Sequence, residues 1–202
     1  MVTEARALPN EPFVKIDPDR WRPALPADVW VAGFPAGNVL RADVFDLAGR
    51  WRLGEVPSRS LLAAACAWGY GPVGYGLHRT RTALANDPDG ALLDRALAAL
   101  RADLPGEDDL QRAYAAFRTA AHVRGLGPSF FTKVLYFAGY RRGIGGVQPL
   151  ILDKVIATRL PPEAGVTSKV FRWRSTEWMS YLRWAAGQGP EPDHVEVALF
   201  NV

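Results

Sequence analysis

Apolar residues recur at helical spacing through most of the chain. Leu92, Leu93, Ala96, Leu97 and Leu100 form one such series, which predicts a helix over residues 90–102. Similar series, bounded by proline, glycine or acidic residues, predict helices over 59–68, 77–85, 108–123, 128–138, 153–160, 176–186 and 192–200. Few stretches alternate apolar and polar positions with a period of two. The pattern therefore predicts an all-α fold.

The segments between these helices suggest how the chain is organised. Residues 1–56 are rich in proline and tryptophan, with short helical pieces at 17–21 and 42–48, and we expect them to wrap a helical core. The glycine-rich stretch 69–76 is expected to be irregular. The length of 202 residues suits one domain, or two lobes around one core. We therefore predict a single domain over 1–202, with its functional segment at 107–160.

Composition narrows the class of protein. Apolar residues make up 49% of the chain and charged residues 22%, which is ordinary for a soluble globular protein. No apolar run reaches the length of a membrane span, and residues 1–15 lack the apolar core of a signal peptide, so we expect a cytoplasmic protein without a membrane partner. Cys66 is the single cysteine, which excludes an internal disulfide and four-cysteine metal sites. We expect no metal and no cofactor.

Charge is unevenly distributed along the chain. The net charge is only +3, but residues 120–184 carry ten Lys or Arg against three Asp or Glu, which gives this segment +7 and the remainder −4. A local positive field of this kind favours a polyanion such as nucleic acid. The alternative is an ordinary solvated basic surface.

The basic segment contains a tight turn, Gly125-Leu126-Gly127-Pro128, between two predicted helices. Glycine permits positive φ and the close approach of a phosphate. We expect the Leu126 side chain to pack into the core and fix the turn. Pro128 suits the first position of a helix, where its missing N–H leaves no hydrogen bond unmade. The backbone N–H groups near Ser129 would then face an anion, beside the basic side chain of Arg124. The alternative is a helix connection without a ligand.

Lys133 and Asp153 are the candidate reactive groups. Lys133 lies one helical turn from Ser129 among apolar and aromatic neighbours, where desolvation favours a neutral, nucleophilic amine. Asp153 precedes the next helix, where it would cap the N-terminus and could also stabilise positive charge or accept a proton. The alternatives are a lysine whose stem covers apolar surface and an aspartate that only caps a helix.

Together these residues resemble a known family. Gly-Leu-Gly, an apolar helix with a lysine, and an aspartate twenty residues later are similar to the helix-hairpin-helix DNA glycosylases, in particular the bacterial 8-oxoguanine DNA glycosylase-like branch. The segments from Gly127 to Phe137 and from Leu150 to Asp153 are the most specific part of this resemblance. One feature departs from the family pattern: its usual lysine stands two residues after the second glycine, where this chain has Ser129.

The resemblance implies two helical lobes around a cleft, base flipping and excision of a modified base. It makes Lys133 the nucleophile and Asp153 the catalytic carboxylate, and it implies AP-lyase chemistry through a lysine Schiff base. The expected partner is double-stranded DNA, with a monovalent cation at the hairpin. The expected DNA contacts are Arg124, Gly125, Gly127, Ser129 and Lys154. The base can be oxidised guanine or another modified base, including one from an invading phage genome.

A flipped base needs stacking surfaces. The candidates are Trp68, Tyr70, Phe130 and Phe137, although most aromatic residues are core residues. Two rival hypotheses remain. One is a DNA-binding protein that keeps the hairpin without catalysis, and the other is a helical protein unrelated to DNA.

Overall fold

The computed structural model describes residues 13–167 and 172–201, and over these the fold is all-α with one small sheet. The helices of more than four residues are α2 Arg41–Arg52, α3 Ser58–Tyr70, α4 Gly76–Asn86, α5 Ala91–Leu97, α6 Glu107–Arg118, α7 Pro128–Gly139, α8 Lys154–Arg159, α9 Ser175–Ala186 and α10 Pro192–Asn201. The shorter ones are α1 Pro18–Trp21 and the 3-10 turns η1 Arg22–Ala24, η2 Ala98–Arg101 and η3 Pro162–Ala164.

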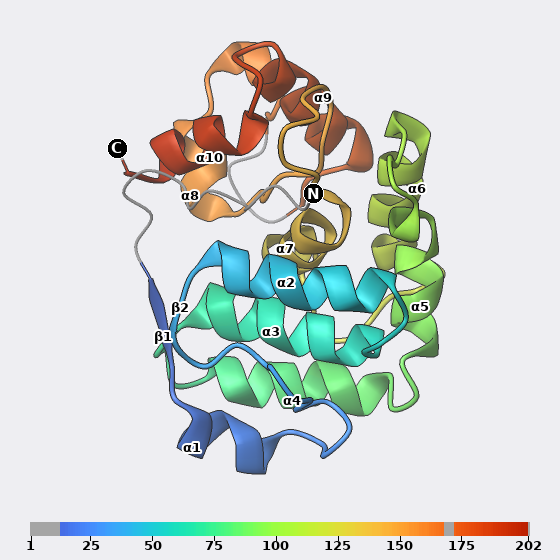
Figure 1. Cartoon of the computed structure of the whole chain (residues 1–202). Coiled ribbons are helices and arrows are strands. Elements are labelled where there is room, and N and C mark those ends of the chain that lie inside the picture. The colour runs from blue at the N-terminus through green and yellow to red at the C-terminus, as the bar shows by residue number, and fades with distance from the viewer. Residues whose placement is uncertain (1–12, 168–171, 202) are drawn as a thin grey trace.

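Two groups of helices lie on either side of α7 (Figure 1). Helices α2, α3 and α4 lie one below another in the lower part of the view, while α8, α9 and α10 form the upper part and α6 runs along one side. Helix α7 packs against α3, α2 and α6, and α9 packs against α6 and α10. Every residue of α7 except Phe130 is buried, as expected for a helix that is apolar on all sides. This central position explains how a lysine on α7 becomes buried.

The N-terminal layer contains the sheet, which the sequence pattern did not predict. Strands β1 Val14–Ile16 and β2 Gly37–Val39 pair antiparallel, with Val14 opposite Val39 and Ile16 opposite Gly37. Three-residue strands are too short to show a period of two, which explains why the pattern missed them. The first twelve residues of the predicted layer lie outside the described residues.

Several helix boundaries differ from the expected ones for local reasons. Helix α6 ends at Arg118 rather than near 123, because Thr119 leaves the helical region with φ −133° and ψ −100°. The helix expected over 90–102 is divided into α5 and η2. Helix α3 continues through Gly69 to Tyr70, so the irregular segment starts later than predicted, at Gly71 with φ +55°. None of the described helices has the length and apolarity needed to cross a membrane.

Candidate functional site

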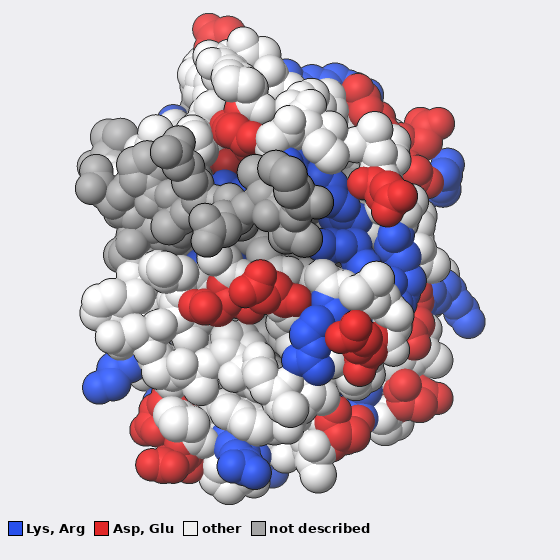
Figure 2. Space-filling view, in the orientation of Figure 1, with Lys and Arg blue, Asp and Glu red and all other residues white. Residues whose placement is uncertain are grey.

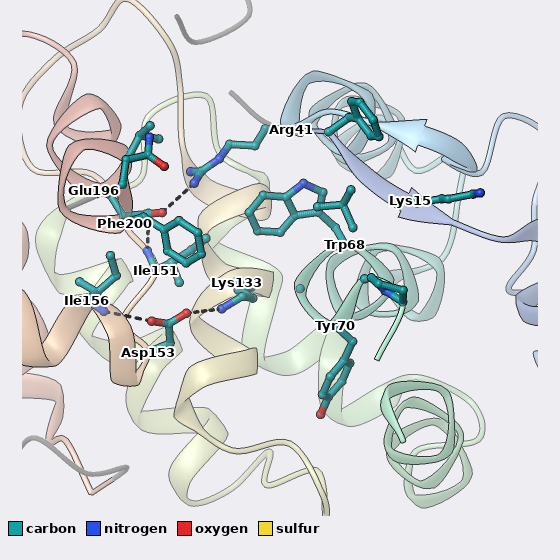
Figure 3. Close-up of a pocket in the computed structure, with 17 residues that line it drawn as sticks. Lys15, Arg41, Trp68, Tyr70, Lys133, Ile151, Asp153, Ile156, Glu196 and Phe200 are labelled. Atoms are coloured by element: carbon teal, nitrogen blue, oxygen red, sulfur yellow. Dashed lines mark hydrogen bonds and ion pairs between the residues drawn. The ribbon is translucent and has the colours of Figure 1, made fainter. Parts of the chain in front are cut away.

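Lys133 and Asp153 meet in an ion pair. The Nζ of Lys133 lies 2.9 Å from Oδ2 of Asp153 and also donates a hydrogen bond of 3.1 Å to the carbonyl oxygen of Ser129. Both side chains are largely buried, with 8% and 18% of their surfaces exposed. Figure 3 shows the two groups pointing toward each other from α7 and from the start of α8. The structure thus brings together the two residues that the sequence singled out as reactive.

Backbone contacts fix the position of Asp153. Its Oδ1 accepts a hydrogen bond of 3.1 Å from the N–H of Ile156, so the residue caps α8. The hydroxyl of Thr132, next to Lys133 on α7, accepts a hydrogen bond of 3.1 Å from the N–H of Leu152 and donates one of 2.7 Å to the carbonyl oxygen of Pro128. Thr132 therefore ties the residue before Asp153 to the helix that carries the lysine.

The environment of Asp153 keeps its carboxylate ionised. Burial by itself raises the pKa of Asp153, but the charge of Lys133, the hydrogen bond from its Nζ and the N–H groups at the start of α8 together outweigh burial and leave the pKa below its ordinary value. The carboxylate is therefore negative at neutral pH. The carboxylate can stabilise a positive charge that develops beside it. It can also accept a proton from the ammonium group of Lys133.

The ion pair forms part of the wall of a cavity of about 450 Å³ between the two groups of helices. Most of the lining is apolar or aromatic and comes from β1, α3, the segment before α8, and α10. The lining residues are Phe13, Val14, Lys15, Arg41, Trp68, Gly69, Tyr70, Gly71, Pro72, Lys133, Ile151, Asp153, Ile156, Glu196, Val197, Phe200 and Asn201. A cavity of this size, with few polar groups on an apolar wall, is typical of a site for a small molecule or a single base.

A second ion pair lines the same cavity, and sequence reasoning missed it. Nη2 of Arg41 lies 2.9 Å from Oε1 of Glu196, and the other carboxylate oxygen accepts a hydrogen bond of 3.1 Å from the N–H of Ile151. The guanidinium also lies 5.0 Å from the centre of the Trp68 ring. Burial raises the pKa of Glu196, against the opposing effect of Arg41. No local motif marks these residues, because α2 and α10 meet only in the folded chain.

The four predicted base-stacking residues do not all reach the cavity. Trp68 and Tyr70 line it, whereas Phe130 and Phe137 are not among the lining residues. Phe137 is fully buried and packs edge-on against Trp68, with ring centres 5.4 Å apart. Phe130 stacks on Tyr70 at 3.9 Å. Phe200, which the sequence analysis did not select, does line the cavity and is 49% exposed.

The Gly-Leu-Gly turn connects α6 to α7. Leu126 is buried as expected, and Arg124 is exposed. Gly125 has φ +87°, a region that favours glycine, whereas Gly127 has φ −82° and is the N-cap residue of α7, in an extended conformation that other residues also adopt. Ser129, in the first turn of α7, is buried, and its hydroxyl has no hydrogen-bond partner among the residues that the structure describes.

Charges on the face drawn in Figure 2 are mixed. Lys and Arg side chains gather between the upper and lower groups of helices, with acidic side chains beside them. Lys154, the first residue of α8, is exposed next to Asp153. Among the residues that the structure describes, no three His, Cys, Asp or Glu side chains gather to hold a metal ion.

We expect Gly69→Ala to lower the activity of the site strongly by displacing Lys133, and to lower the free energy of unfolding only modestly. A Cβ at Gly69 would lie 2.7 Å from Cδ of Lys133, so the lysine stem has to move away from α3. Such overpacking costs about 1–3 kcal/mol of the free energy of unfolding. The matched control is Gly49→Ala on α2, where the new Cβ makes only an ordinary contact of 3.7 Å. Urea unfolding and the site's activity are measured for both variants, and unchanged activity in Gly69→Ala would show that the lysine position does not matter.

Comparison with known families gives a match over nearly the whole chain. A family model described as "Putative 8-oxoguanine DNA glycosylase OGG-like protein" matches residues 8–200. This range contains the turn, the Lys133–Asp153 pair and every residue that lines the cavity except Asn201. No curated protein and no solved structure matches the chain.

Proposed function

We propose that this chain, which belongs to the OGG-like family of 8-oxoguanine DNA glycosylase-type proteins, excises a modified base from double-stranded DNA. The observation that carries the proposal is the ion pair of Lys133 and Asp153 on the wall of a mainly apolar cavity of about 450 Å³. An amine beside a carboxylate at the edge of a base-sized cavity suits attack on the sugar carbon that bears the base.

The target base has to leave the duplex before this pair can reach its sugar. In the proposed complex the base enters the cavity, where Trp68 and Phe200 offer aromatic surfaces to its faces. The Arg41–Glu196 pair offers donors and acceptors to its edge. Buried charges on the wall of an apolar cavity cost free energy unless they are paired. A base whose edge carries complementary hydrogen-bond donors and acceptors can bond to this ion pair, and a base without them is bound less well.

The proposed reaction uses the two groups in sequence. As the bond from C1′ to the base nitrogen breaks, its electron pair leaves with the base, and the negative Asp153 stabilises the positive sugar. The ammonium group of Lys133 then passes one proton to Asp153 across their hydrogen bond, and the electron pair freed on Nζ bonds to C1′. A second proton passes from the nitrogen to O4′ as the bond between C1′ and O4′ breaks, which opens the sugar ring and leaves a protonated Schiff base on Lys133. Loss of the C2′ proton then expels the 3′ phosphate, which is the proposed AP-lyase step.

The turn before α7 is the proposed contact to the DNA backbone. Its extended Gly127 and the N–H group of Ser129, in the first turn of α7, suit a phosphate oxygen one helical turn from Lys133. Arg124 precedes the turn in the sequence, and Lys154 follows Asp153. Both side chains are exposed and would add positive charge near the DNA backbone. Contacts of this type hold the DNA without reading its sequence.

We expect Arg124→Ala to weaken duplex binding to a similar extent for all sequences. Losing one phosphate contact releases about one counterion fewer, so the slope of log K against log salt should decrease by about one. Fluorescence anisotropy at several salt concentrations measures both quantities. Arg95→Ala is the control, since Arg95 is an exposed arginine of α5 far from the turn in sequence. An unchanged salt slope in Arg124→Ala would remove this residue from the interface.

The test of the proposed function is base release from a panel of duplexes, each with one modified base. We expect mass spectrometry to detect the free base from the 8-oxoguanine duplex or from another member, such as a base typical of modified phage DNA. Salt-sensitive binding without release of any base would overturn the proposal and support a DNA-binding protein without catalysis. Absence of duplex affinity would overturn both.

A further inference from the structure

Helix α7 carries a second polar group on the face that holds the reactive lysine. Tyr136 is three positions after Lys133, so the two side chains are neighbours on the helix surface. Tyr136 is fully buried and is not one of the residues that line the cavity. Burial raises the pKa of Tyr136 well above its ordinary value, so the hydroxyl keeps its proton at neutral pH. The proposed reaction uses Lys133 and leaves this hydroxyl without a role.

A buried carboxylate of α10 accepts the proton of this hydroxyl. Asp193, in the first turn of α10, is fully buried, and its Oδ2 accepts a hydrogen bond of 2.9 Å from Tyr136. Nη2 of Arg142 lies 3.1 Å from the same oxygen, and the Tyr140 hydroxyl lies 3.0 Å from Oδ1. A buried carboxylate costs free energy unless it has such partners. Asp193 is therefore a fixed point in the contact between α7 and α10.

Tyr136 connects this fixed point to Arg41, which does line the cavity. Because the hydroxyl proton goes to Asp193, the oxygen of Tyr136 acts as an acceptor toward Arg41, whose Nη1 donates a hydrogen bond of 3.1 Å. Nη2 of the same guanidinium pairs with Glu196 at 2.9 Å. A planar guanidinium that is held at both terminal nitrogens cannot turn without breaking one of these contacts. Tyr136 thus fixes the orientation of Arg41 on the cavity wall.

We propose that Tyr136 is a positioning residue for base selectivity, which orients Arg41 against Glu196 and so fixes the donors and acceptors that the cavity offers to a base edge. This inference rests on the proposed function, because it concerns which base the cavity accepts. A site discriminates between bases when its polar groups cannot turn to suit a different edge. Since Lys133 and Tyr136 share one face of α7, the same helix places the nucleophile and the group that orients the base-edge pair.

The experiment compares two bases that differ by one edge group, under single-turnover conditions. One is the base that the wild-type protein releases fastest from the duplex panel, and the other is its analogue without that group; for 8-oxoguanine the analogue is 8-oxohypoxanthine, which lacks the 2-amino group. The wild-type protein should favour the complete base by about tenfold or more. Tyr136→Phe removes only the hydroxyl and should lower this ratio at least about fivefold, because Arg41 can then turn to suit the analogue.

Two further readouts distinguish positioning from a structural role. Affinity for a duplex with an abasic site should stay within about twofold in Tyr136→Phe, because this DNA has no base edge to read. In a double-mutant cycle, adding Tyr136→Phe to Arg41→Gln should leave the ratio within about twofold, because Tyr136 acts through Arg41. Tyr140→Phe is the matched control and should keep the wild-type ratio. Its hydroxyl contacts Asp193 and Glu191, so its loss leaves the bond between Tyr136 and Arg41 in place.

The outcomes separate this proposal from the proposed function. If the wild-type protein releases no base from any duplex, the proposed function fails and this inference with it. If base is released and Tyr136→Phe lowers the ratio by less than about fivefold, including when both bases are slowed equally, only the further inference is overturned. A wild-type ratio below about tenfold would also overturn it, since the cavity then does not read the edge. A further fall of the ratio in the Arg41→Gln background would show that Tyr136 does not act through Arg41.

Discussion

Replacing Lys133 by glutamine abolishes the covalent adduct between the protein and its DNA substrate. The proposed Schiff base forms on the Nζ of this residue, and glutamine has no nucleophilic nitrogen to replace it. Borohydride reduction in the presence of a modified duplex, followed by denaturing electrophoresis, measures the adduct. The loss should be complete within detection, since Lys133 is the only amine within hydrogen-bond distance of Asp153 among the described residues.

Lys15→Gln provides the matched control. Lys15 also lines the cavity, but it comes from β1, is exposed, and extends away from Lys133 in Figure 3. This variant should form the adduct at the wild-type level. An adduct that survives Lys133→Gln would exclude Lys133 as the nucleophile. Base release without any adduct in the wild-type protein would also contradict this role and assign the attack to water.

Replacing Asp153 by asparagine should lower the rate of base release by about 10²–10³-fold, the usual effect of removing one preorganised electrostatic contact. Asparagine keeps an oxygen for the N–H of Ile156, so α8 remains capped and the fold should persist. The change therefore removes the charge more selectively than alanine would. Single-turnover base release is the measurement, with circular dichroism to check the fold. Full activity in Asp153→Asn would refute the proposed role of the carboxylate.

The same substitution has a pH signature in stability. Because the folded pKa of Asp153 lies below its ordinary value, the ion pair stabilises the protein above that ordinary value, near 4, and this stability is lost as pH falls through the folded pKa. The difference in free energy of unfolding between wild type and Asp153→Asn should therefore be largest near neutral pH and shrink in acid. Urea unfolding at several pH values measures it.

The parts of the site that the sequence could indicate are those set by local rules. Leu126 between two glycines and Pro128 at a helix start are turn and capping signals, and the structure has the buried leucine and the helix that they predict. An apolar helix with one lysine, followed by a capping aspartate, also indicated the two candidate reactive groups. The hydrogen bond between Thr132 and the N–H of Leu152, which holds the residue before Asp153 against α7, was not visible as a motif.

The rest of the site depends on contacts between distant segments. Arg41 and Glu196 are 155 positions apart, and nothing near either residue indicates its partner. Phe137 and Trp68 look alike as aromatic candidates, yet packing around α7 buries Phe137 completely and leaves Trp68 on the cavity wall. Which face of a wholly apolar helix meets the cavity is decided by the helices around it, and a single helical period carries no such information.

Peptide mapping of the reduced protein–DNA adduct tests the central claim most directly. After digestion of protein and DNA, mass spectrometry locates the sugar remnant on the chain. We predict that it lies on Nζ of Lys133, within the α7 peptide. A remnant on any other lysine, or on the N-terminal amine, would contradict the reaction proposed for this cavity.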